Sequence, residues 1–95
     1  MKEHVFQDNP IRSKIEMMQD IVAIIHCLHT GKPLAADPFI EDLKVRSIHL
    51  GDQVQQDVLM FVEQVQFQYA YDPWHKITKD VQVAADRLIE HLYTT

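Results

Sequence analysis

The sequence predicts an all-α protein, a small antiparallel bundle of about four helices. Three observations lead to this prediction. Three dipeptides place a helix-capping residue directly before a proline, at Asn9-Pro10, Asp37-Pro38 and Asp72-Pro73. Apolar residues recur with the helical period between these dipeptides. Only 2 glycines occur among the 95 residues, which leaves little material for the tight turns of a β-protein.

The capping residues and glycines set the expected helix limits. An Asn or Asp side chain accepts a backbone N–H at a helix start, and proline at the first helical position loses no hydrogen bond. Gly31 closes the first helix, and Asp52 begins the third after Gly51, with Gln55 completing a capping box. A bent helix that continues through Gly51 is the alternative. The four expected helices span residues 10–30, 38–50, 52–71 and 73–93.

Each expected helix has one apolar stripe. The shorter second helix has only Phe39, Leu43 and Leu50. The stripe of the first helix contains Ile11, Ile15, Met18, Ile21, Val22, Ile25 and Leu28, opposite Arg12, Ser13, Glu16, Gln19 and Asp20. The stripe of the last helix contains Trp74, Ile77, Val81, Ala84, Ala85, Leu88 and Leu92, opposite Lys79, Asp86 and Glu90.

The third helix has a competing interpretation. Residues 65–71 alternate between apolar and polar types as a half-buried strand would. A strand needs a partner, and the short Val5-Phe6 stretch is the other candidate. A helical stripe nevertheless runs through the same region, so we expect a helix. Its members are Val54, Val58, Phe61, Val62, Val65 and Tyr69.

Length and composition limit the class of protein. A chain of 95 residues forms one domain, which we expect at residues 10–95 after an N-terminal arm at residues 1–9. A bundle of this size has modest stability, which dimerisation would increase. The lone Cys27 fits a reducing compartment, and the first residues lack the hydrophobic core of a signal peptide, so we expect a cytoplasmic protein.

The charge excludes some partners. The net charge is −5, and the closest basic pair, Lys44 and Arg46, is diluted by Glu41 and Asp42. A nucleic-acid-binding protein needs clustered cations, so we expect neither nucleic acid nor an anionic membrane surface as partner. No apolar run reaches the length of a membrane span. Other protein surfaces remain as candidate partners.

A second apolar stripe on the third helix is the strongest functional signal. Met60, Phe67 and Tyr71 project opposite the main stripe, within about 40° of one another. Methionine and aromatic residues are enriched at the centres of protein interfaces, so these three residues are the expected interface. The alternative is that another segment of the chain, such as residues 1–8, covers this face.

Metal binding is the second functional hypothesis. His26 and His29 lie three residues apart and could share a metal with a carboxylate of a neighbouring helix. Cys27 falls on the polar side of the helix, away from both. The alternative is a histidine pair that interacts with the helix dipole. Among the other histidines, His75 and His91 are candidates for a pH-responsive contact.

Catalysis finds little support in the sequence. Neither Ser13 nor Ser47 lies in a nucleophile elbow, and the segment 31–33 has one glycine and cannot form a phosphate-binding loop. We therefore expect neither enzyme activity nor a cofactor.

The size and four-helix pattern resemble the immunity proteins of bacteriocin producers and some phage-encoded inhibitors. This resemblance is one of fold alone, and it assigns no role to any residue. The leading expectation is a small, non-catalytic cytoplasmic protein that acts through protein–protein contact, as a homodimer or as an accessory regulator.

Overall fold

The computed structural model describes residues 10–71 and 77–94, except the side chains at positions 10, 33, 69 and 71. This part of the chain forms an all-α bundle, which confirms the predicted fold class. Its elements are α1 (Pro10–His29), the 3-10 helix η2 (Pro33–Ala36), α2 (Asp37–Ser47), the 3-10 helix η3 (Ile48–Leu50), α3 (Asp52–Tyr71) and α4 (Lys79–Thr94). The predicted arm at residues 1–9 lies outside the described residues.

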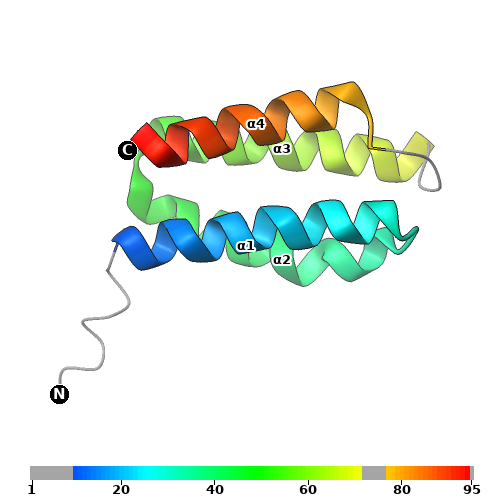
Figure 1. Ribbon diagram of the computed structural model, residues 1–95, viewed down its shortest axis with the longest axis horizontal. Helices are drawn as coiled ribbons and strands as arrows, with labels where there is room; N and C mark the ends of the chain where they lie inside the picture. Colours follow the sequence, from blue (N-terminus) through cyan, green and yellow to red (C-terminus); the bar gives the residue numbers. More distant parts are fainter. Residues whose placement is uncertain (1–9, 72–76, 95) are drawn as a thin grey trace, which may run out of the picture.

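The bundle consists of two antiparallel helical hairpins. Figure 1 shows α1 beside α2 in one hairpin and α3 beside α4 in the other, with successive helices running in opposite directions. α2 also packs on α3, whereas the α1 and α4 backbones approach each other at few points. Side chains from all four helices fill the space between the hairpins and form one continuous core.

The turn of the first hairpin depends on a glycine. The N–H of Lys32 donates to the carbonyl of Cys27 at 2.9 Å, and the N–H of Gly31 donates to that of Leu28 at 3.2 Å. These two bonds form a Schellman motif, which needs a residue with positive φ, and Gly31 has φ 72°. The predicted end of the first helix is therefore confirmed to within a residue.

The connection between the hairpins is also set by a glycine. α2 tightens into η3, and Gly51 then adopts φ 97° and ψ 167°, a conformation almost exclusive to glycine. The helix is broken here, so the bent continuous helix is excluded. The amide of Gln55 donates to the carbonyl of Ile48 at 3.2 Å, which is a different bond from the predicted capping box.

Two further predictions concern α3 and α4. α3 is helical through Tyr71, so the strand interpretation of residues 65–71 is wrong. α4 begins at Lys79, later than the predicted start at Pro73, because Thr78 caps it: its hydroxyl accepts the Val81 N–H at 3.2 Å. Pro73 and Trp74 lie outside the described residues, and Ile77 packs against the core before the helix begins.

The inward face of α1 differs from the predicted one. Met17, Ile21, Ile24 and Leu28 are fully buried, whereas Ile11, Ile15 and Val22 are exposed. Ser13 and Asp20, which were predicted on the polar side, are also buried. Apolar residues occupy about two-thirds of the circumference of α1, so helical periodicity alone cannot select the half that faces the core.

Candidate functional site

The structure describes the side chains of two of the three residues predicted as an interface on α3. Met60 is 46% exposed and Phe67 is 60% exposed. Both therefore have much of their surface outside the core, as the second stripe predicted. The side chain of Tyr71 lies outside the described residues. We refer to Met60 and Phe67 as the outer face of α3.

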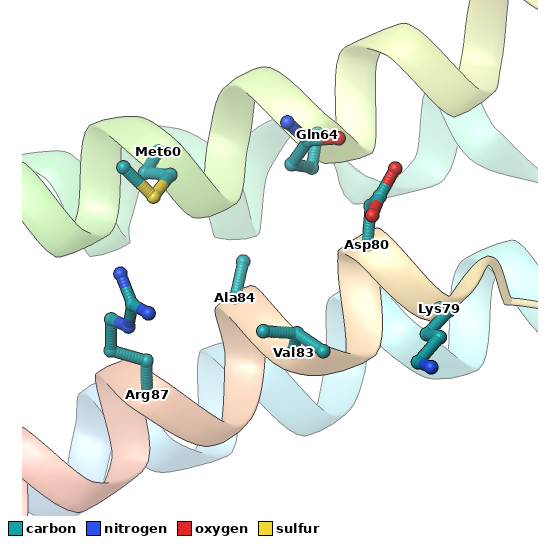
Figure 2. Close-up of a pocket in the computed structure, with 7 residues that line it drawn as sticks. All are labelled: Met60, Gln64, Lys79, Asp80, Val83, Ala84 and Arg87. Atoms are coloured by element: carbon teal, nitrogen blue, oxygen red, sulfur yellow. The ribbon is translucent and has the colours of Figure 1, made fainter.

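Met60 lies at a groove between α3 and α4. Figure 2 shows Met60 and Gln64 of α3 on one side, and Arg87 of α4 directed toward Met60. The other lining residues, all from α4, are Lys79, Asp80, Val83 and Ala84. The groove has an apolar floor with two cations and one carboxylate at its edges. This combination of charged and apolar side chains suits binding of a segment that is itself partly polar and partly apolar.

A second exposed apolar surface lies on α1. Ile15 is 53% exposed and Val22 is 65% exposed, Ile11 is also exposed, and Met18 and Ile25 are half-buried at the edge of the core. We call these five residues the outer face of α1. A shallow depression on this face is lined by Ile15, Met18, Gln19, Val22, Ala23 and His26. It is less polar than the groove between α3 and α4.

The outer face of α1 was assigned to the core by the sequence interpretation, and the structure corrects this. Residues 11, 15, 18, 22 and 25 are separated by four, three, four and three positions, and the core-facing Met17, Ile21, Ile24 and Leu28 are separated by four, three and four. The two faces therefore have the same spacing, which does not tell which of them is buried.

The proposed metal ligands do not converge. His26 and His29 are exposed, and Cys27 is buried, which contradicts its prediction on the polar side. Cys27 is buried because it belongs to the core cluster that also contains Ile24. Within residues 10–71 and 77–94, no group of three or more His, Cys, Asp or Glu side chains is arranged to hold a metal ion.

One buried carboxylate links α1 to α2. Asp20 is 7% exposed, and its burial together with hydrogen bonding to Asp42 raises its pKa to about 8. The hydrogen bond from Asp20 lowers the pKa of Asp42, and the Arg46 guanidinium, which donates to Asp42 at 2.8 Å, lowers it further. Arg46 also lies 3.9 Å from Glu16. A pKa this high favours the protonated form of Asp20 at neutral pH, in which its carboxyl group can donate to Asp42.

A second buried carboxylate links α3 to α4. Asp57 is buried, and its carboxylate pairs with Nδ1 of His91 and accepts from the Gln53 amide at 3.3 Å. The sequence singled out His91 as a candidate for a pH-responsive contact but did not identify its partner. His75, the other candidate, lies outside the described residues.

The polar side chain of Gln68 is also buried. Its carbonyl oxygen accepts the Thr78 N–H at 3.0 Å, which positions the start of α4.

Across the described helices, none is long and apolar enough to cross a membrane. Comparison with known proteins found no matching protein family, no matching curated protein and no matching solved structure.

Proposed function

We propose that this chain is a small non-catalytic protein that acts through contact with other proteins, as a homodimer or as an accessory regulator. The observation that carries this proposal is the outer face of α1, where Ile15 and Val22 are more than half exposed. Large contiguous apolar patches are rare on monomers, because water-exposed apolar area is unfavourable, and they commonly mark interaction sites.

The outer face of α3 supports the same proposal. Met60 and Phe67, both partly exposed, are residue types enriched at interface centres. Met60 also borders the groove in which Arg87 and Asp80 offer polar contacts beside the apolar floor. The two surfaces belong to different hairpins.

The polar interior supports a non-catalytic role. Asp20 bonds to Asp42 across α1 and α2, Asp57 pairs with His91 across α3 and α4, and Gln68 binds the backbone of Thr78. Each of these groups joins two elements of the bundle. A cytoplasmic location is part of the proposal, because a reducing compartment suits the buried free thiol of Cys27.

In-cell photo-crosslinking tests this function. A photoreactive phenylalanine analogue replaces Met18 on the outer face of α1 or Phe67 on the outer face of α3, in cells that naturally produce the protein. The matched control replaces Gln82, an exposed residue on α4. We expect protein adducts from at least one of the two surface positions and none from Gln82. Absence of adducts from both surface positions would contradict the proposal.

A further inference from the structure

We propose that the groove between α3 and α4 binds a short segment of another protein in which one carboxylate side chain lies beside an apolar side chain. This inference rests on the proposed function, since it names the chemistry of the partner at one surface of the bundle. Three features support it: the shape of the groove, the guanidinium at one end of it and the charge of the rest of the chain.

A small residue between two longer ones forms the groove. Asp80, Ala84 and Arg87 are separated by four and three positions, so they lie along one side of α4. The methyl group of Ala84 leaves a depression between the two charged side chains, which begin about 10 Å apart along the helix. Figure 2 shows Arg87 opposite Met60 and Asp80 opposite Gln64 across this depression.

The size of the groove suits a side chain of a protein segment rather than a whole metabolite. Its volume is about 250 Å³, which is less than the roughly 300–1,000 Å³ of most small-molecule sites. Met60 and Val83 on its lining are 46% and 48% exposed. An apolar side chain of the partner would remove both from water, which favours binding.

The guanidinium of Arg87 is available to a partner. Among the residues that the structure describes, no carboxylate pairs with Arg87, whereas Arg46 is held by Asp42 at 2.8 Å. Asp86, next to Arg87 in the sequence, accepts from the Gln82 amide at 3.1 Å instead. A guanidinium binds a carboxylate through two parallel hydrogen bonds, so the matching group on the partner is a carboxylate.

The charges favour one carboxylate over a cation or a long acidic tract. Lys79 and Arg87 give the lining two positive charges against the one negative charge of Asp80, whereas the whole chain carries −5. Asp80 lies next to Lys79 and about 10 Å along the helix from Arg87, about one Debye length at physiological salt, so it weakens the attraction at Arg87 little. A long acidic tract would be repelled by the net charge of the chain.

Selection from a random peptide library tests the chemistry of the partner. The probe is a displayed library of short peptides of random sequence, and the target is the purified full-length protein at neutral pH and physiological salt. We expect the selected peptides to be enriched in Asp or Glu beside an apolar residue. Enrichment in Lys or Arg, or recovery of no binding peptide, would overturn the inference.

Charge reversal at Arg87 provides a matched comparison. Arg87→Glu and Lys32→Glu change the net charge equally, and Lys32 is exposed but does not line the groove. Circular dichroism checks that both variants fold. We expect Arg87→Glu to weaken binding of a peptide selected on wild type at least about tenfold, because hydrogen bonds to a charged group are lost, and to shift a new selection toward basic peptides. Lys32→Glu should retain wild-type binding. Equal enrichment for wild type and Arg87→Glu would contradict the assignment of the groove.

Further measurements separate the other possible occupants. Sedimentation should give wild type and Arg87→Glu the same mass, and a wild-type dimer that Arg87→Glu abolishes would overturn the inference in favour of a second copy. Peptide binding at least tenfold tighter after replacement of both Val5 and Phe6 by alanine would overturn it in favour of the chain's own residues 1–9. Peptide binding that depends on Val22 but not on Arg87 would also overturn it, and would leave the proposed function intact.

Discussion

The two hairpins of this bundle differ in how they accommodate a buried carboxylate. Each contains one buried carboxylate that links its two helices. Asp57 in the α3–α4 hairpin pairs with the imidazole of His91 and accepts from the Gln53 amide. Asp20 in the α1–α2 hairpin has another acid, Asp42, as its hydrogen-bond partner, so its own charge is suppressed.

Because of this difference, we expect opposite changes in stability when Asp20 is replaced and when the partner of Asp57 is removed. Removal of the partner of a buried carboxylate destabilises the fold, because the carboxylate then lacks compensation. A carboxylate that must be protonated in order to be buried costs stability at neutral pH, since the unfolded chain would release its proton. Replacement of Asp20 and of His91 tests this comparison.

The largest effect is expected from Asp20→Asn. The raised pKa of Asp20, about 8, means that the folded state retains a proton that the unfolded chain releases near pH 4. The free energy of unfolding of the wild type should therefore fall as pH rises from about 4 to 8, by at most about 1.4 kcal/mol per pH unit from this group. Asparagine removes this loss and can still donate to Asp42.

Urea unfolding at several pH values measures this effect. Asp20→Asn should be close to wild type in stability at about pH 4 and more stable by a few kcal/mol at pH 8. The control Asp86→Asn changes an exposed carboxylate on α4 and should follow the wild-type profile. Parallel pH profiles of Asp20→Asn and wild type would show that Asp20 is ionised in the fold.

The next effect is expected from His91→Ala. In this variant the buried Asp57 carboxylate still accepts from the Gln53 amide but no longer pairs with an imidazole. We expect a loss of about 1–3 kcal/mol in the free energy of unfolding, because the imidazole is about one-third exposed and water replaces part of its role. The control His49→Ala, at an exposed position in η3, should change stability by less than about 0.5 kcal/mol. Equal effects of the two changes would mean that the His91–Asp57 pair does not stabilise the α3–α4 hairpin.

The smallest effect is expected at the start of α4. The α1–α2 turn depends on the positive φ of Gly31, whereas α4 begins with a side-chain cap from Thr78. Thr78→Ala removes the bond to the Val81 N–H and should lower the free energy of unfolding by about 1 kcal/mol in chemical denaturation. Thr78→Ser retains a hydroxyl and should recover most of this loss. A serine variant as unstable as the alanine variant would assign the effect to lost packing of the threonine methyl group.

The candidate surfaces were predictable to different degrees. The exposed positions of Met60 and Phe67 follow from the second stripe of α3, because the main stripe of that helix is continuous and identifies its inward side. α1 gave no such guidance, since both of its apolar faces can be buried. The two faces of α1 share the same spacing, so only the packing of the other helices identifies the inner one.

The sequence by itself determined four helices and most of their ends. Proline at Pro10 and in the Asp37-Pro38 pair, and the positive φ that glycine allows at Gly31 and Gly51, act within a few residues and need no distant partner. Tertiary structure decided which side of α1 faces inward and where Asp20 and Asp57 are buried. Those choices depend on groups that other helices supply, Asp42 and Arg46 from α2 and His91 from α4, and periodicity along one helix contains no information about them.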